Sequence, residues 1–296
     1  MNGEAPMTAI KQQVREFYDQ VGWREVGKGV YQNARYEDLR PVSREYIHRC
    51  HLRVNRHLKN GGRYVLDAGS GPIQYPEYLE YSQGYQRRVC ADISIVALQE
   101  ARQRIGKHGL FVVADIANLP FKQDVFDGVV SLHTIHHLPE EEHLNAFTGL
   151  HRVLAPGRNA VVVNGWPSST LMSLAAPFIR LAQFVRRLAA RLAGRQKSSD
   201  SEPEESLPGE QLAAGKQPKG TFINRHDARW IKAEVGALMH VEILVWRSVS
   251  VRFLRVLIHP QLGGRLWLKG LYWLEERFPR FFGEQGQYPL IVIRKA

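Results

Sequence analysis

The stretch Arg63-Tyr64-Val65-Leu66-Asp67-Ala68-Gly69-Ser70-Gly71-Pro72 joins a short apolar run, an acid and two glycines one residue apart. This pattern predicts a buried parallel strand that turns sharply into a helix. Such a turn brings backbone N–H groups and the positive helix end to one point, where an anionic ligand group can bind. Glycine permits the turn and lets a ligand approach the main chain closely. We therefore expect a ligand site where this strand ends.

Further strand-sized apolar runs follow, separated by helix-sized segments. Residues 88–92 end at Asp92, residues 110–116 include Asp115, and residues 126–133 end at His133. This alternation predicts an α/β protein with a doubly wound parallel sheet. An acid about twenty residues beyond the glycine turn, such as Asp92, can accept hydrogen bonds from the ribose hydroxyls of a nucleoside.

The order of these motifs resembles the class I S-adenosylmethionine-dependent methyltransferases, in particular the branch of the ubiquinone and menaquinone biosynthesis methyltransferases. The resemblance covers roughly residues 64–164. It implies a doubly wound, seven-stranded, mostly parallel sheet of Rossmann-like type with helical additions. The last two strands, residues 241–246 and 288–293, are then expected to pair antiparallel at one edge. The cofactor that the resemblance implies is S-adenosylmethionine.

The resemblance also implies roles for single residues. Those at the methionine end of the cofactor are Asp67, Gly69, Ser70 and Gly71, with His133 near its amino and carboxylate groups. Those at the nucleoside end are Asp92 on the ribose, Ile93 against adenine, and Asp115 with the backbone of Ile116 on the adenine edge. The chain departs from the family pattern at Ile73, where a third glycine is usual.

Two alternatives fit these motifs less well. A nicotinamide or flavin dinucleotide site requires glycine at the first, third and sixth positions, and the sixth position here is Gln74. Such a site also has no role for Asp115. In the second alternative, the acids only end strands and bind nothing. Three acids and a glycine turn at these spacings favour the S-adenosylmethionine site.

Two residues are candidate catalytic residues. The cluster His133, His136 and His137 could bind zinc, but no cysteine lies nearby and a further ligand is not placed, so we predict no metal. His136 is our candidate general base for a phenol or enol nucleophile, because imidazole titrates in a suitable range. Tyr18 lies in a predicted helix over residues 8–20 that would cover the cofactor as a lid. For both residues a packing role is the alternative.

Composition limits the functional class. The chain of 296 residues is 44% hydrophobic, carries a formal charge of +11, and has two cysteines, Cys50 and Cys90. Two cysteines fit buried thiols in a reducing compartment better than a set of disulfides. The first residues lack the basic-then-apolar pattern of a signal peptide, so we expect a cytoplasmic globular protein. The basic excess attracts nucleic acid or anionic membranes. The stretch Ser131-Leu132-His133-Thr134 lacks the Asn/Asp-Pro-Pro-aromatic motif of base-modifying methyltransferases, which argues against a nucleic-acid substrate.

We expect four regions along the chain. These are a helical lid over residues 1–60, the methyltransferase core over 61–195, a flexible insertion over 196–220, and the rest of the core over 221–296 with an aromatic-rich helical insertion before the last strand. Residues 171–192 predict a basic amphipathic helix, which either lies on an anionic membrane or packs on the core. Prolines and polar residues interrupt the uncharged residues 160–179, so a membrane span is not expected.

These patterns together predict methyl transfer to oxygen or carbon of a small, lipophilic acceptor such as a quinone, a phenol or a lipid precursor. Peripheral contact with a membrane would bring the enzyme to such an acceptor. A protein that binds S-adenosylmethionine without turnover, as a scaffold or partner subunit, is the first alternative. A nucleic-acid methyltransferase is the second.

Overall fold

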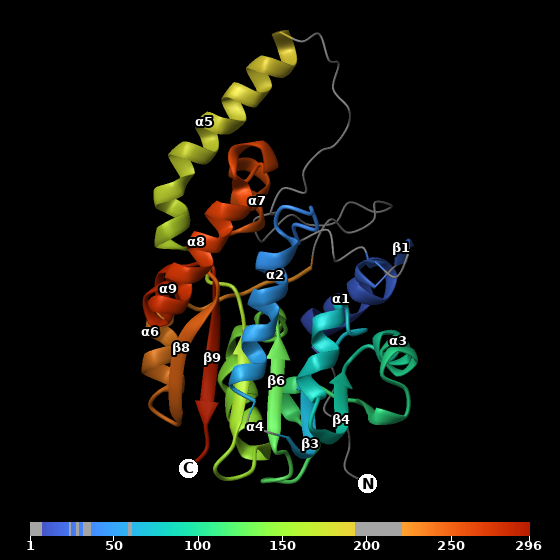
Figure 1. Cartoon of the computed structure of the whole chain (residues 1–296). Helices are drawn as coiled ribbons and strands as arrows, with labels where there is room; N and C mark the ends of the chain where they lie inside the picture. Colours follow the sequence, from blue (N-terminus) through green and yellow to red (C-terminus); the bar gives the residue numbers. More distant parts are fainter. Residues whose placement is uncertain (1–7, 24, 28–29, 32–36, 59–60, 193–220) are drawn as a thin grey trace.

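A computed structural model describes residues 8–23, 25–27, 30–31, 37–58, 61–192 and 221–296. Its centre is a seven-stranded sheet of order β5-β4-β3-β6-β7-β9-β8 (Figure 1). The strands are β3 (Gly62–Ala68), β4 (Tyr85–Asp92), β5 (Gly109–Val113), β6 (Gly128–Leu132), β7 (Asn159–Val163), β8 (His240–Arg247) and β9 (Tyr288–Arg294). The first five are parallel, and β9 pairs antiparallel with both β7 and β8. The predicted fold class and antiparallel edge are confirmed.

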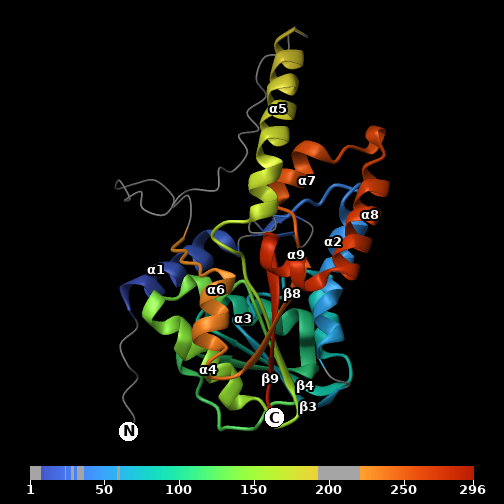
Figure 2. The same cartoon turned by 90° about the vertical axis from the view of Figure 1, so that its left-hand side faces the viewer.

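Helices cover both faces of this sheet. Those of the α type are α1 (Ala9–Phe17), α2 (Arg44–His51), α3 (Ile95–Ile105), α4 (His143–Val153), α5 (Thr170–Leu192), α6 (Ala228–Trp230), α7 (Val251–Leu257), α8 (Gly264–Arg277) and α9 (Pro279–Gln285). A small pair of antiparallel strands, β1 (Glu25–Gly27) and β2 (Val30–Tyr31), follows α1. Figures 1 and 2 show α1 and α2 lying toward the carboxyl ends of the parallel strands.

The core consists of three clusters of buried apolar side chains. One face of the sheet packs on α4, with Phe147 and Leu150 fully buried, and the other packs on α3 and the residues after β3. A third cluster joins α2 to α7 and α8 around Tyr46, Leu254 and Leu268. The side chains of β7 alternate between the first two clusters, with Ala160 and Val162 in one and Val161 and Val163 in the other, which explains why its apolar run is continuous, as in a strand buried on both faces.

The prediction of a helix directly after the glycine turn is wrong. Residues 69–75 are irregular, and only a 3₁₀ helix, Pro76–Ser82, follows. Pro72 lacks the N–H that a regular helix would use, and Ile73 has a left-handed φ of 57°. The turn therefore offers single backbone N–H groups rather than a helix dipole.

The spacing of apolar residues also predicts helices over residues 41–59 and 222–238, and both are shorter in the structure. The helix placed at 41–59 is α2 followed by a 3₁₀ turn, Leu52–Arg56, although its predicted face with Cys50 and Val54 is buried. The helix placed at 222–238 begins only at α6 and continues as a π helix, Ile231–Val235. The insertion predicted at 196–220 lies outside the described residues.

The helical additions leave large apolar side chains exposed to solvent. Helix α5 projects away from the body (Figures 1 and 2) and packs near its start on α7. Its residues Leu174, Phe178, Leu181, Phe184, Val185 and Leu188 are 45–68% exposed. Packing of this stripe on the core, the favoured of two predictions, is therefore wrong. None of the helices in the described ranges is long and apolar enough to cross a bilayer.

Candidate functional site

The glycine turn after β3 is closely fitted to its surroundings. Gly69 has a φ of 75°, and a Cβ at this residue would lie 2.2 Å from the Thr134 side chain. Gly71 has a φ of 54°, and a Cβ there would lie 3.1 Å from the ring of Trp23. Any larger residue would be strained in backbone and contact alike. The turn thus forms a narrow cradle beneath Trp23, and Ser70 between the glycines is buried.

Asp92 ends β4 beside this cradle. Its two carboxylate oxygens accept backbone N–H groups of Gly71 and Ser94, each at 2.9 Å. Burial raises the pKa of Asp92 to about 6, although those two N–H groups act in the opposite direction. Each oxygen keeps a further lone pair, so the carboxylate can still accept from hydroxyl groups. Ile93 lies half-buried next to it, and its predicted contact with adenine stays a prediction.

Asp115 follows β5, one strand further out. Its Oδ1 accepts the N–H of Ala117 at 2.9 Å, and its Oδ2 pairs with Nζ of Lys11. The same Nζ lies 2.5 Å from Glu142. Burial lowers the pKa of Lys11, but the two carboxylates outweigh this and raise it. Ile116 beside Asp115 is buried and its side chain packs in the core, and the predicted contact of its backbone with adenine stays a prediction.

The predicted binding residues share one edge of the sheet. The order β5-β4-β3-β6 places Asp115, Asp92, the glycine turn and His133 in sequence along the carboxyl ends of neighbouring strands. This is the crevice where ligands bind in open α/β sheets. An extended ligand lying along it would meet the residues in the order that the sequence predicted.

Asp67 differs from the other acids. Its carboxylate forms a buried ion pair with the guanidinium of Arg88, whose Nε lies 3.2 Å from Oδ2. Both side chains are almost fully inaccessible. Asp67 therefore has its charge balanced within the fold, and its predicted contact with the methionine end stays a prediction.

The first helix covers this edge. Lys11 of this helix pairs with Asp115, and Asp19, just after the helix, accepts a hydrogen bond from the hydroxyl of Ser94. The ring of Trp23 stacks on that of Tyr18, with ring centroids 4.7 Å apart. The phenol oxygen of Tyr18 lies 2.8 Å from Nε2 of His137. The contacts of Lys11, Asp19 and Tyr18 join the segment 11–23 to residues at the carboxyl edge, as a lid would.

His133 ends β6 in a strained conformation. Its φ is 55°, in the left-handed region that non-glycine residues rarely adopt. The ring lies 5.1 Å from Trp246 and 5.9 Å from Tyr288, between centroids. Burial lowers the pKa of His133 to about 3, helped by Arg247. His133 is thus neutral at pH 7.

The rings of His136 and His137 lie 4.2 Å apart between centroids, tilted by 51°, and both are also neutral. Nδ1 of His136 lies 3.1 Å from Oδ1 of Asn164, and Nδ1 of His137 lies 2.8 Å from the Phe222 carbonyl oxygen. Since both Nδ1 atoms face acceptors, each ring carries its hydrogen there, and Nε2 can accept. Burial lowers the pKa of His137 to about 4 and that of His136 well below its ordinary value.

The surroundings of His136 are tight. It borders a cavity of about 10 Å³ that Asn164, His143 and Asn224 also line. A cavity of this size holds about one water molecule. In the described part of the chain, the histidine triplet does not belong to any group of His, Cys, Asp or Glu placed to hold a metal.

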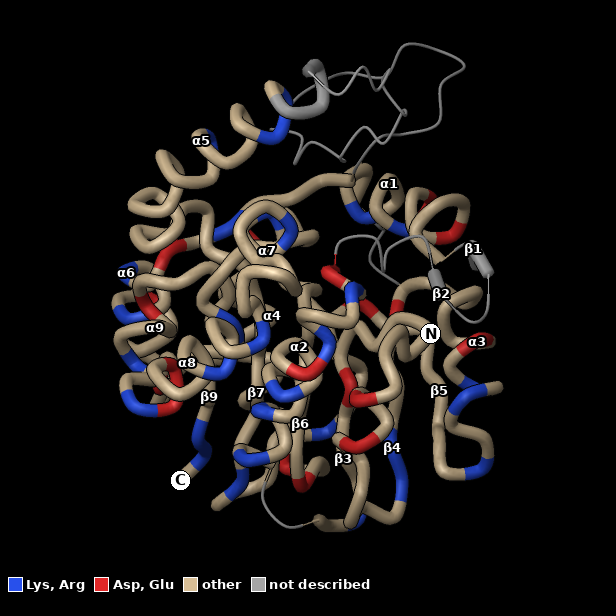
Figure 3. Tube along the Cα trace, turned by 45° about the horizontal axis from the view of Figure 1, so that its top comes forward, with Lys and Arg blue, Asp and Glu red and all other residues tan. Residues whose placement is uncertain are grey.

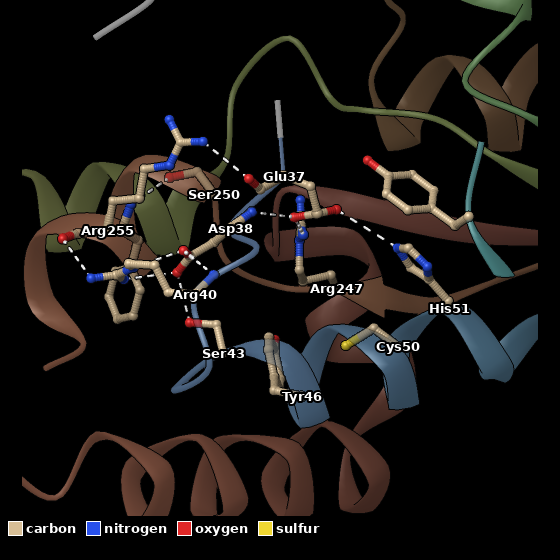
Figure 4. Close-up of polar contacts among 12 residues, drawn as sticks. Glu37, Asp38, Arg40, Ser43, Tyr46, Cys50, His51, Arg247, Ser250 and Arg255 are labelled. Carbon is tan, nitrogen blue, oxygen red and sulfur yellow. Dashed lines mark hydrogen bonds and ion pairs between the residues drawn. The ribbon is translucent and has the colours of Figure 1, made fainter. Parts of the chain in front are cut away.

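A buried charge cluster lies beyond His133 (Figure 4). Glu37 pairs with Arg247, and its other oxygen lies 3.7 Å from Nε2 of His51. Nδ1 of His51 lies 3.7 Å from Glu77. Burial raises the pKa of Glu37, but Arg247 and His51 outweigh this and lower it to about 2. Burial lowers the pKa of His51, but Glu37 and Glu77 outweigh the effect of burial, and the pKa is raised overall.

Sequence reasoning missed Lys11, Arg88 and the Glu37 cluster. Lys11 occupies a helix position with no motif, and Arg88 lies in a strand where an apolar residue is usual. Glu37 and Arg247 are 210 residues apart, so spacing could not pair them. Asn164 could have been found, because it directly follows β7, as His133 follows β6.

Comparison with known proteins agrees with this geometry. Residues 66–162 match the family model described as "Methyltransferase domain". The curated "Methyltransferase GfsG" of Streptomyces halstedii is 27% identical over 125 residues, which cover 40% of this chain. The aligned part spans 44% of the length of that relative.

Solved structures share the fold along nearly the whole chain. Geranyl diphosphate C-methyltransferase from Streptomyces coelicolor A3(2) has 14% identity and a TM-score of 0.51, with 99% of this chain and 100% of that chain covered. The [4+2]-cyclase SpnF has 17% identity and a TM-score of 0.50, with 97% of both chains covered. At such identities the likeness shows the fold alone.

The edge itself fits S-adenosylmethionine. The glycine cradle leaves no room for a Cβ, Asp92 keeps free lone pairs for a diol, and the lid segment reaches three positions along the edge. The family match and the fold support this molecule as the cofactor. Residues 66–162 thus carry a methyltransferase domain, in a chain with the class I S-adenosylmethionine-dependent methyltransferase fold.

Proposed function

We propose that the chain transfers a methyl group from S-adenosylmethionine to oxygen or carbon of a small, lipophilic acceptor. The observation that carries the proposal is the order of Asp115, Asp92, Gly69–Gly71 and His133 along one sheet edge under the lid. A quinol, a phenol or a lipid precursor, the acceptors of the resembling branch, are the proposed substrates. Their ring or chain would lie beyond His133.

When bound, S-adenosylmethionine supplies a methyl group on a positively charged sulfur. The chain then has to align the acceptor for in-line displacement, in which the methyl–sulfur bond breaks, sulfur keeps the electron pair, and the acceptor bonds the methyl carbon. Gly69, Gly71 and Asp92 fix the cofactor, while Tyr18 and Trp23 exclude water. His136 is the proposed base, because its Nδ1–H donates to Asn164 and leaves Nε2 to take the acceptor proton.

The lowered pKa of His136 makes it a weak base but an uncharged one. An uncharged imidazole does not repel a sulfonium, and one water in the adjoining cavity can relay the proton. Replacing His136 by Gln should lower methyl transfer about a hundredfold while S-adenosylhomocysteine affinity stays within about twofold.

The test is transfer of tritiated methyl from labelled S-adenosylmethionine to a panel of quinols, phenols and isoprenoid alcohols. Turnover with at least one acceptor, lost in His136→Gln, supports the proposal. Binding of S-adenosylhomocysteine without turnover on the whole panel would favour the second candidate, a non-catalytic binding protein. The [4+2]-cyclase SpnF shares this fold under a name that gives no methyl transfer, so the fold alone does not decide between the candidates.

We also propose that α5 binds an anionic membrane surface, where a lipophilic acceptor would reside. Six of its large apolar residues are exposed, and residues 170–199 contain five arginines and no acid. Such a helix lies in the lipid interface through apolar burial and attraction to anionic lipids.

Flotation with vesicles tests this surface. The chain should float with phosphatidylcholine vesicles containing phosphatidylglycerol at low salt, and less at high salt. Leu181→Ser should reduce flotation, whereas Leu238→Ser, at a similarly exposed leucine (60% and 57%), should not. Equal flotation of the two variants, or dimerisation through α5 in place of flotation, would reject the membrane role.

A further inference from the structure

A second cavity lies away from the sheet edge, between α2 and α8. Its volume is about 430 Å³, and helices α2 and α8, which form it, pack against each other. Figure 3 shows Lys and Arg positions on both helices. The groove shares only Glu77 with the residues of the candidate site described above.

The floor of the groove is apolar and firmly held. Val42, Tyr46, Leu268 and Tyr272 line it, and each is at most 4% exposed. The hydroxyl of Tyr46 donates to Glu275 at 2.7 Å, and Glu275 is itself ion-paired with Arg53 at 2.9 Å. The guanidinium of Arg53 lies 4.3 Å from the Tyr272 ring centroid. The floor is thus fixed before any ligand arrives.

The rim carries an excess of positive charge. Four cationic side chains line the groove: Arg44, Arg49, Arg265 and Lys269. Arg49 lies over the Tyr272 ring at 3.8 Å, and within the described residues the side chains of Arg44, Arg265 and Lys269 make no hydrogen bond or ion pair. Two acids, Glu45 and Glu77, also line the groove, so four cations face two carboxylates; Nδ1 of His48 lies 2.7 Å from Glu77.

We propose that this groove binds an amphipathic anion, an apolar chain or ring that carries a phosphate. The apolar part would cover Leu268 and Val42, and the phosphate would lie among Arg44, Arg265 and Lys269. A phosphate monoester carries almost two negative charges at pH 7 and three strong acceptor oxygens, which match several unpaired donors. The molecule is either free in solution or the headgroup and upper chain of a bilayer lipid.

Calorimetric titration with octyl phosphate tests the site. The wild type should bind it saturably, and affinity should rise about two- to fourfold per methylene from butyl to octyl phosphate. Inorganic phosphate, which lacks the apolar part, and octanol, which lacks the charge, should each bind at least tenfold more weakly. Equal affinity for octyl phosphate and inorganic phosphate would overturn the proposal.

Matched variants make the test specific. Arg265→Gln with Lys269→Gln should weaken octyl phosphate binding at least tenfold, and Glu45→Gln should tighten it. Arg102→Gln with Lys107→Gln on the α3 side, an identical loss of charge, should change nothing. Equal losses in the two double variants would overturn the site, since they would show attraction to net charge only.

Two further measurements separate the ligand sources and the two proposals. In the Leu181→Ser background, in which flotation through α5 is reduced, vesicles containing phosphatidic acid that float the parent chain, but not Arg265→Gln with Lys269→Gln, identify a bilayer lipid. Octyl phosphate binding without such flotation identifies a free amphiphile, and either result supports the groove. S-adenosylhomocysteine affinity should be the same in this variant and the wild type. The proposal of methyl transfer can therefore be rejected while the proposal of the groove is supported, and the proposal of the groove can be rejected while methyl transfer is supported.

Discussion

The phenol oxygen of Tyr18 lies 2.8 Å from Nε2 of His137, a residue 119 positions further along the chain. This hydrogen bond ties the end of the first helix to the turn after β6. The Tyr18 ring also stacks on Trp23, which lies over Gly71. One side chain therefore connects the lid to both the glycine cradle and the histidine cluster.

Removing only the Tyr18 hydroxyl should loosen the lid. Tyr18→Phe keeps the ring on Trp23 and loses one hydrogen bond, a change of about 1 kcal/mol. We expect S-adenosylhomocysteine affinity to fall about three- to tenfold in calorimetry, with a change in Tm of a few degrees at most. Tyr18→Ala should lose more, because the stacking also disappears. Wild-type affinity in Tyr18→Phe would show that the bond does not hold the lid.

Lys11 should hold the lid helix by charge. Lys11→Met leaves Asp115 and Glu142 facing each other without the cation between them, and unpaired carboxylates in a partly buried site repel. Hydrogen exchange of the amides in residues 9–17 should become at least about tenfold faster. Lys107→Met, at an exposed lysine, is the control. Unchanged exchange in Lys11→Met would mean that apolar packing alone fixes α1.

His51 should make stability depend on pH. Its pKa in the folded chain is raised above the ordinary value by Glu37 and Glu77 despite burial. The stabilising contribution is therefore complete below about pH 6.5 and is lost as the pH rises through the raised pKa. Urea unfolding from pH 6 to 9 should show this decline in the wild type and a smaller one in His51→Gln. Parallel curves for the two proteins would contradict the ion cluster.

Asp92 should make the affinity for the cofactor fall in acidic solution. Burial raises its pKa to about 6, so the carboxyl group is protonated in more acidic solution and accepts hydroxyl hydrogens poorly. The dissociation constant of S-adenosylhomocysteine should rise by up to about tenfold per pH unit below 6. Asp92→Asn should bind weakly with no such slope between pH 5 and 7. A slope that persists in Asp92→Asn would assign it to another group.

The sheet could be predicted because each strand is a short apolar run bounded by polar residues. The runs ending at Asp92 and His133 have this form, and the crossovers between them leave few arrangements. Local geometry was less predictable. The absent helix after Gly71 reflects Pro72 and the left-handed Ile73, whose conformation depends on burial in the core.

Amphipathic patterns identified helices but not their partners. In the aromatic-rich insertion, helical spacing predicts an apolar face with Trp267 and Leu274. In the structure Trp267 on α8 is 72% exposed, and the buried face contains Leu268, Tyr272 and Glu275. Glu275 is buried because Arg53 and Tyr46 pair with it from α2 and the turn after it. Such pairings depend on the tertiary structure, which periodicity cannot report.

The central claim is that carboxylates at the sheet edge bind the nucleoside of S-adenosylmethionine. Calorimetry of S-adenosylhomocysteine with wild type, Asp92→Ala and Glu141→Ala, an exposed carboxylate removed as a control, tests it most directly. We predict micromolar binding by the wild type and by Glu141→Ala, and at least a thirtyfold loss, about 2 kcal/mol, in folded Asp92→Ala. No uptake by the wild type, or equal uptake by Asp92→Ala, would contradict the account.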